Sequence, residues 1–288
     1  IVNFKNSFKS FNPLICFSVK SNYNSTILRI IKEHGLGADV VSDGELKKVL
    51  SLGFKPNRIV YSGVGKKFEE LKYAISKNIL LINVESESEL KNIKKIAEKF
   101  GKKVSVGLRL NPNIDAKTNT KISTGRIQDK FGLNGNDIIR ILNKFKNSRN
   151  IKIKCLSVHI GSQITQNKPY NNVLIAINKI LSKSKYKFEY IDLGGGMGIK
   201  YIKDNKKLDY SKLSKNIHKF SKRNNCKIIF EPGRSIVGNT AVLLTKVIYI
   251  KNSSNKKFII IDAGMNDLIR PALYNATHDI IPLTKKSS

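Results

Sequence analysis

Short apolar runs alternate with longer stretches of helical period along most of the chain. This alternation is typical of parallel strands joined by crossover helices. Eight of the apolar runs predict strands, at residues 15–19, 38–41, 58–61, 80–84, 104–110, 155–160, 190–193 and 227–230. The stretches between them predict seven helices, at residues 24–33, 44–52, 68–76, 88–100, 137–145, 172–182 and 211–223.

Eight strands separated by seven helices are the number that a (β/α)8 barrel of the TIM type requires. We therefore predict an α/β fold in which the strands close into a barrel, and an open doubly wound sheet is the structural alternative. A barrel also gathers its functional side chains where the strands end, at the carboxyl face. Candidate residues lie at or just after the end of every predicted strand, at Lys20, Ser42, Ser62, Glu85, Asn111, His159, Gly194 and Glu231.

The alternation of strands and helices stops after the eighth predicted strand. Residues 241–249 and 257–262 both predict strands, and the polar residues 252–255 predict a turn between them. We expect residues 1–235 to form the barrel and residues 236–288 to begin a second, β-rich domain that is incomplete at Ser288. The chain starts with Ile1 rather than methionine, and we expect it to be a fragment of a longer protein.

The formal net charge is +32, from 53 lysines and arginines against 21 acidic residues. Only nine of the basic residues are arginines, and the lysines are spread over nearly every polar stretch among many asparagines and isoleucines. A nucleic-acid-binding protein concentrates its basic residues on one face or stripe. The even spread indicates a compositional bias, so we expect no nucleic-acid partner.

No apolar run approaches the roughly 18 residues that span a bilayer, and the first residues lack the pattern of an export signal. The three cysteines, Cys16, Cys155 and Cys226, lie in or beside apolar segments. Their odd number and their places favour reduced, buried thiols over a disulfide framework, and their spacing fits no metal site. We expect a cytoplasmic protein without a membrane partner and without a metal.

The first candidate for a reactive group is Lys20, which ends the first apolar run. A lysine at the end of a buried strand is costly unless it has a purpose, although most lysines simply face water. The glycine triplet at residues 194–196 follows the seventh predicted strand, where its unshielded N–H groups suit a phosphate, or else it forms a tight turn. Gly233 and Arg234 open the loop after the next strand, where the phosphate sites of barrels are often found.

Two further side chains extend this set. Glu231 follows the eighth predicted strand, where it pairs with Arg234, caps a helix or faces a cationic ring nitrogen. His159 is either a hydrogen-bonded structural residue or a flat ring that stacks on a planar cofactor. Together these residues describe a pyridoxal phosphate site. Such a site needs an amine that forms an imine, N–H groups that bind a phosphate, a carboxylate that pairs with a pyridinium nitrogen, and a flat ring that stacks on the cofactor.

The chain also resembles the diaminopimelate decarboxylases, which belong to the alanine-racemase-like, fold type III enzymes that use pyridoxal phosphate. The resemblance extends over nearly the whole chain, and its most specific segment is DAGMNDLIRPALY at residues 262–274. Other segments that carry it lie at residues 18–22, 37–42, 62–66, 83–86, 122–125, 130–132, 159–163, 193–196 and 231–234.

The resemblance implies that Lys20, His159 and Glu231 are the catalytic residues. Lys20 binds the cofactor as an imine, His159 stacks on the cofactor ring and Glu231 pairs with the ring nitrogen. Further cofactor contacts, including those that hold the phosphate, are implied for Gly194, Gly195, Gly196, Pro232, Gly233, Arg234 and Tyr274. Substrate contacts are implied for Arg234, Arg270 and Tyr274.

The implied reaction removes carbon dioxide from the D-configured end of meso-2,6-diaminopimelate and leaves L-lysine, the last step of lysine biosynthesis. The resemblance also implies a homodimer with active sites at the interface, to which a Cys-Glu segment and a late tyrosine contribute. Neither follows Tyr274 in this chain. The alternatives are a related decarboxylase that acts on ornithine, arginine or carboxynorspermidine, and a truncated homologue without catalytic activity.

Overall fold

Eight parallel strands close into a barrel in the computed structural model, which describes residues 1–116, 124–201 and 208–283. Each strand pairs with the next along the chain, and β1 pairs with β8 to close the ring. The predicted barrel is confirmed, and the open sheet is wrong. The strands are β1 (Leu14–Ser18), β2 (Gly37–Val40), β3 (Ile59–Tyr61), β4 (Leu81–Val84), β5 (Val104–Arg109), β6 (Ile151–Ser157), β7 (Tyr190–Asp192) and β8 (Lys227–Phe230).

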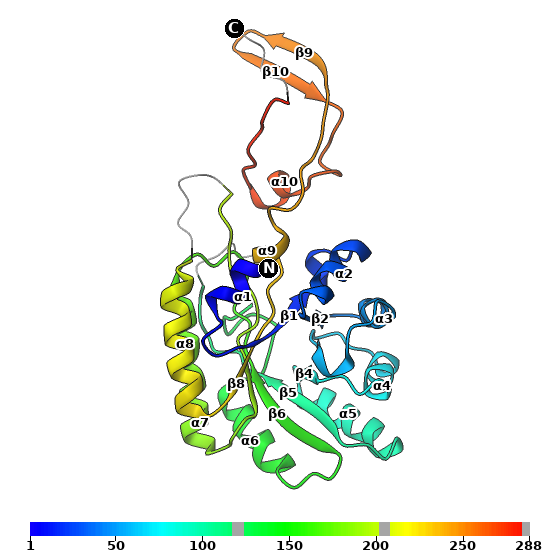
Figure 1. Ribbon diagram of the computed structural model, residues 1–288, viewed down its shortest axis with the longest axis vertical. Coiled ribbons are helices and arrows are strands. Elements are labelled where there is room, and N and C mark those ends of the chain that lie inside the picture. The colour runs from blue at the N-terminus through cyan, green and yellow to red at the C-terminus, as the bar shows by residue number, and fades with distance from the viewer. Residues whose placement is uncertain (117–123, 202–207, 284–288) are drawn as a thin grey trace.

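Helices connect consecutive strands and cover the outside of the barrel (Figure 1). They are α2 (Ser25–Glu33), α3 (Asp43–Ser51), α4 (Phe68–Ser76), α5 (Glu87–Lys99), α6 (Gly135–Phe145), α7 (Asn167–Ser184) and α8 (Tyr210–Asn224). Several begin at a residue whose side chain accepts hydrogen bonds from the first turn, namely Asn24, Ser42, Ser86, Asn134 and Asp209. Ser42, expected among the functional residues, is therefore a helix cap here.

A short helix that the sequence pattern did not predict, α1 (Val2–Ser7), precedes the barrel. Its aromatic side chains Phe4 and Phe8 pack on Phe230 of β8 and on Tyr210 of α8, with ring centroids 4.6 to 6.0 Å apart. The chain continues from β8 into only one helical turn, α9 (Arg234–Val237). Helix α1 therefore covers the outer face of β8, which a longer helix after that strand would otherwise cover.

Residues beyond α9 form an antiparallel hairpin of β9 (Val247–Ser253) and β10 (Lys256–Ile261), followed by α10 (Arg270–Tyr274). The two predicted strands are thus present, but the first begins at Val247 and not at residue 241. Both faces of the hairpin are exposed, including large apolar residues such as Tyr249 and Ile250. Figure 1 shows the hairpin projecting away from the barrel.

Two expectations from composition can be compared with the structure, that of the free thiols and that of the membrane. Cys16 and Cys155 are buried, Cys226 is half-buried, and all three are free thiols as predicted. Across the three described ranges of the chain, no helix is long and apolar enough to cross a membrane. The resemblance segment at residues 122–125 lies partly outside the described residues.

Candidate active site

The carboxyl ends of β1, β7 and β8 meet at one end of the barrel. Ser18 donates its backbone N–H to the carbonyl oxygen of Pro232 at 3.1 Å, and Glu231 donates its own to the carbonyl oxygen of Gly194 at 2.8 Å. These bonds hold the loops after the three strands against one another. Lys20, the glycine triplet and Glu231 therefore lie at the same end of the barrel, where functional loops are expected.

Lys20 lies in a tight turn, Val19–Ser21, directly after β1. Its side chain is exposed, and no described residue makes a hydrogen bond or an ion pair with its amine. Its positive charge nonetheless acts on the buried carboxyls of Asp39 and Glu231, because it lowers the pKa of each against the larger, opposite effect of burial. The amine thus has no hydrogen-bond or ion-pair partner among the described residues, and it is close enough to both acids to affect their pKa values.

Besides Glu85, which forms an ion pair with Arg109, three carboxyl groups among the described residues are buried at this end of the barrel. Asp39 in β2, Asp192 at the end of β7 and Glu231 after β8 are 1%, 0% and 8% exposed. Burial raises the pKa of all three, that of Asp192 to about 6. The pKa of Glu231 is raised further by the nearby carboxyls of Asp192 and Asp39, and is well above its usual value. Part of this cluster therefore keeps its protons at neutral pH.

The sequence analysis did not single out Asp39 or Asp192. Each is an acidic residue inside an apolar strand, which is a signal that could have found it, since acids are rarely buried without a partner. Asp39 accepts a hydrogen bond from the Ser18 hydroxyl at 2.8 Å. Asp192 accepts from the backbone N–H of Gly194 at 2.9 Å and from the side-chain amide of Asn83 at 3.2 Å.

The glycine triplet is required by the close approach of its neighbours. Gly194 and Gly196 have φ values of +64° and +90°, which disfavour a side chain. A Cβ on Gly195 would overlap the carbonyl oxygen of Glu231, and one on Gly196 would overlap that of Gly161. The triplet is therefore fixed by close packing, and two of its three N–H groups already donate within the chain, that of Gly194 to Asp192 and that of Gly195 to His159.

Replacing Gly195 by alanine is expected to lower the free energy of unfolding by about 1–3 kcal/mol, because the new methyl group forces β7 and β8 apart. Denaturant unfolding measures this change. The matched control is Gly65→Ala, since nothing lies within 4 Å of a Cβ at Gly65 and no positive φ is found there. Equal stabilities for the two variants would contradict the close packing described here.

His159, in the loop after β6, is half-buried and bonded through its ring. The backbone N–H of Gly195 donates to His159 Nδ1 at 3.2 Å. Burial lowers the pKa of His159 well below its usual value, and the positive charges of Lys20 and Arg109 lower it further. The imidazole is therefore neutral with its proton on Nε2, a flat and uncharged ring at the barrel mouth.

Arg234 opens α9 and does not pair with Glu231. It donates from Nε to the Ser162 hydroxyl at 3.2 Å and from another guanidinium nitrogen to the Tyr201 hydroxyl. The guanidinium of Arg270 lies 4.2 Å from the centroid of the same tyrosine ring, which brings the segment beyond the hairpin to the barrel mouth. The expected alternative of an ion pair between Glu231 and Arg234 is wrong in the described part of the chain.

Tyr274, at the end of α10, is half-buried. None of the described residues makes a hydrogen bond with its hydroxyl, and no ring contact with a described residue joins it to the barrel.

Pro232 and Gly233 lie between Glu231 and Arg234, and a Cβ on Gly233 would meet the side chain of Ser21 at 2.9 Å. The structure thus brings every predicted site residue except Tyr274 into one connected region.

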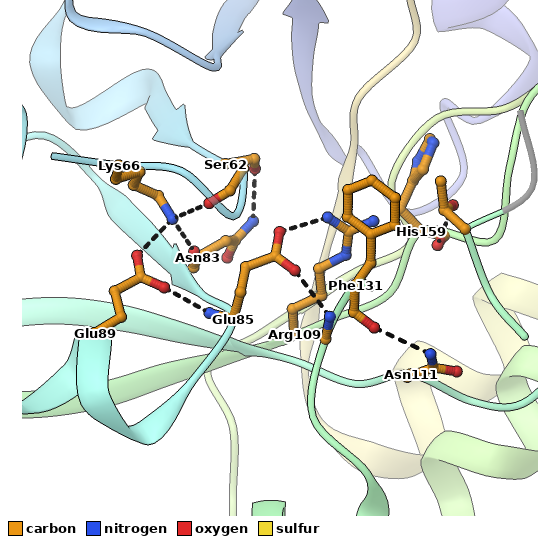
Figure 2. A network of polar contacts seen from close by, with 12 residues as sticks. Ser62, Lys66, Asn83, Glu85, Glu89, Arg109, Asn111, Phe131 and His159 are labelled. Atoms are coloured by element: carbon orange, nitrogen blue, oxygen red, sulfur yellow. Dashed lines mark hydrogen bonds and ion pairs between the residues drawn. The ribbon is translucent and has the colours of Figure 1, made fainter. Parts of the chain in front are cut away.

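A second network supports the mouth of the barrel (Figure 2). Glu85 forms a buried ion pair with Arg109 at 2.6 Å and accepts the backbone N–H of Gly132 at 2.8 Å. The Arg109 guanidinium lies 4.8 Å from the ring centroid of Phe131, and Figure 2 shows that ring on the side of His159. Glu85, one of the residues expected at the strand ends, therefore fixes the loop after β5.

Other kinds of site find no support at this end of the barrel. Among the residues described, no group of three or more histidines, cysteines or acids could hold a metal ion. A cavity of about 630 Å³ lies between the loop after β5 and helices α6 and α7, and of the candidate residues at the strand ends only Asn111 is among its described lining residues. The uncommitted amine and the buried acids make the barrel mouth the better candidate.

The barrel, and the start of the segment after it, match a known family. Residues 1–238 match the family described as "Pyridoxal-dependent decarboxylase, pyridoxal binding domain". The chain belongs to this family. Membership in the pyridoxal-dependent decarboxylases makes pyridoxal phosphate the cofactor that the site must be tested against.

Relatives extend the match beyond residue 238. The diaminopimelate decarboxylase of Aquifex aeolicus is 42% identical over 278 residues, 96% of this chain and 66% of that protein. That of Zymomonas mobilis is 42% identical over 275 residues, 94% of this chain and 65% of that protein. The crystal structure of diaminopimelate decarboxylase from Helicobacter pylori complexed with L-lysine has a TM-score of 0.94 at 40% identity, and the match covers 99% of this chain and 72% of that one. The chain thus spans about two thirds of the length of its relatives.

The residues present fit the decarboxylase cofactor on three observations of this structure. The Lys20 amine has no partner among the described residues. The backbone N–H groups of Gly196 and Arg234 also have no acceptor there, so they remain available to a phosphate. Glu231 is buried with a raised pKa and needs a basic partner for its proton.

Proposed function

We propose that the protein is a pyridoxal phosphate-dependent carboxy-lyase that converts meso-2,6-diaminopimelate to L-lysine and carbon dioxide. The observation that carries the proposal is the uncommitted Lys20 amine beside the buried Glu231 at the mouth of the barrel. Two kinds of relative support the choice of substrate: those named diaminopimelate decarboxylase, and the Helicobacter pylori structure that holds L-lysine, the product of this reaction.

In this proposal each residue at the mouth has a distinct task. Lys20 binds the cofactor covalently through its amine, and the neutral ring of His159 stacks on the cofactor face. Glu231 faces the ring nitrogen and holds a proton there. The backbone of Gly194, Gly195, Gly196 and Gly233, next to Pro232, and the side chain of Arg234 surround the phosphate. Bound pyridoxal phosphate supplies a ring that accepts the electron pair left when carbon dioxide departs.

Substrate binding is proposed for the arginines that meet at Tyr201. A substrate with two amino-acid ends carries two carboxylates, and arginine binds carboxylates through two parallel hydrogen bonds. Arg234 and Arg270 both contact the Tyr201 ring, so the tyrosine separates two like charges and fixes their directions. Tyr274 lies on the same short helix as Arg270 and completes the proposed substrate set.

An assay of carbon dioxide release tests the substrate. The chain, loaded with pyridoxal phosphate, is expected to release carbon dioxide from meso-diaminopimelate and to form L-lysine. Ornithine, arginine and carboxynorspermidine, offered at the same concentration, are expected to give no release above background. Release from one of these amines and not from meso-diaminopimelate would contradict the proposed substrate, while covalent cofactor binding without any release would indicate a homologue without catalytic activity.

The organisation of the chain is also a proposal. We assign residues 1–235 to a cofactor-binding barrel and residues 236–288 to the start of a β-rich domain; the hairpin and the end of the family match at residue 238 support this division. A homodimer is supported by the exposed apolar side chains of the hairpin, such as Ile250 and Phe258. Sedimentation of the chain measures its oligomeric state. Three free thiols support a cytoplasmic location.

A further inference from the structure

Four side chains from opposite sides of the barrel form a closed ring of hydrogen bonds. The Asn83 amide, in β4, donates to Asp192 Oδ2 at 3.2 Å and to Ser62 Oγ at 3.2 Å. The Ser62 hydroxyl, after β3, donates to Glu231 Oε1 at 3.4 Å. The carboxyl groups of Glu231 and Asp192 are hydrogen-bonded to each other, which closes the ring.

A hydrogen bond between two carboxyl groups requires one proton. The donors around the pair decide which member is ionised. Asp192 accepts from the Gly194 N–H at 2.9 Å and from Asn83, whereas the only side-chain donor to Glu231 among the described residues is Ser62, at the longer distance of 3.4 Å. Two good donors stabilise a negative charge on Asp192, so the proton belongs to Glu231.

The orientation of the Asn83 side chain decides which of its amide atoms faces the two neighbouring acceptors. Asn83 Oδ1 is buried, has no hydrogen-bond partner among the residues that the structure describes, and occupies the place that a Cβ on Gly107 would take. Both N–H bonds of the amide therefore point at acceptors, one at Asp192 and one at Ser62. Because the Ser62 oxygen already accepts from Asn83, its own hydrogen turns toward a carboxyl group, and Glu231 shares this donor with Asp39.

We infer that Asp192, oriented by Asn83, is a positioning residue that keeps Glu231 protonated until a basic aromatic nitrogen arrives. This inference deepens the proposed function and rests on it. When the ring nitrogen of the cofactor meets Glu231, the O–H bond of the carboxyl breaks and an N–H bond forms on the ring. Glu231 becomes a carboxylate, the ring becomes a cation, and the total charge does not change.

The other charges that face Glu231 leave this assignment in place. Asp39, bonded to the Ser18 hydroxyl, adds negative charge and favours a protonated Glu231, while the Lys20 ammonium opposes it. The pKa of Glu231 is nevertheless well above its usual value, with burial the largest cause and Asp192 the next. Removing the charge of Asp192 while keeping its shape therefore lowers the pKa of Glu231.

Infrared spectroscopy of the full chain, with and without pyridoxal phosphate, tests the inference. The spectrum of the wild type minus that of Glu231→Gln is expected to show the carbonyl band of a protonated acid at about pH 8, where an ordinary glutamate is ionised. Addition of the cofactor is expected to remove the band. Its absence from the cofactor-free wild type, or its persistence with the cofactor bound, would overturn the inference.

Variants at the two aspartates separate Asp192 from the general charge of the cluster. Asp192→Asn is expected to weaken the Glu231 band at about pH 8 more than Asp39→Asn does, although the two aspartates are equally buried. Equal weakening of the band in both variants would assign the effect to total charge and refute the special role of Asp192. If Asp192→Asn does not fold, the wild-type spectra still decide whether Glu231 is protonated before the cofactor binds and ionised afterwards. Failure of pyridoxal phosphate to bind the wild type would refute the proposed function, while the cofactor-free band would still test the state of Glu231.

Discussion

Replacing Lys20 by alanine is expected to abolish covalent binding of pyridoxal phosphate and to lower decarboxylation by about 10³-fold or more. Lys20 is the amine at the barrel mouth that has no hydrogen bond or ion pair with any described residue, so it is the one expected to form the bond to an aldehyde. Borohydride treatment followed by peptide mapping measures the covalent bond, because reduction makes the link to the lysine permanent.

The matched control is Lys219→Ala, at an exposed lysine of α8. It is expected to retain both covalent binding and turnover, since Lys219 is not part of the site at the barrel mouth. A reduced peptide that contains a lysine other than Lys20 would contradict the assignment. So would normal turnover in the Lys20 variant.

Replacing Glu231 by alanine is expected to retain part of the bound cofactor while lowering turnover by about 10²- to 10³-fold. The carboxyl is buried at the end of β8, and a proton passed from it to the ring nitrogen would leave a carboxylate that stabilises the positive charge of the ring. Without that charge the ring accepts electrons poorly, although Lys20 and the phosphate contacts still hold the cofactor. Cofactor absorption and carbon dioxide release, measured on the same sample, separate binding from turnover.

Glu189→Ala provides the control for this variant. Glu189 is exposed and precedes β7, so it lies at the opposite end of the barrel from Glu231. It is expected to keep full turnover at unchanged cofactor content. Normal turnover in Glu231→Ala would end the argument that this acid keeps the ring positively charged.

Much of the barrel follows from local pattern. Strands β3 and β8 and helix α4 lie within one residue of their predicted bounds, because each is a short apolar or amphipathic segment bounded by polar residues. Strand β6 begins earlier than predicted, at Ile151, because Lys152 and Lys154 alternate with buried residues and break the apolar run. Helix α1 was missed because it is held by aromatic contacts with β8 and α8, which are distant in sequence.

The site was predictable where it depends on the ends of strands. Lys20, His159, the glycine triplet and Glu231 all follow from the rule that barrels gather function at one face. The ring of Asn83, Ser62, Asp192 and Glu231 could not be predicted in this way, because its members meet across the barrel only after the strands have closed. The partner of Arg234 was missed for the same reason, since Tyr201 is not its neighbour in sequence.

The seam between β1 and β8 also has a consequence for how the chain folds. Leu14 pairs with Ile229, so the last edge of the sheet is sealed by segments from nearly opposite ends of the barrel sequence. Contacts of such long sequence separation form slowly, since a large loop must first be ordered. During synthesis one edge of the first strand therefore stays unpaired until the eighth strand has left the ribosome.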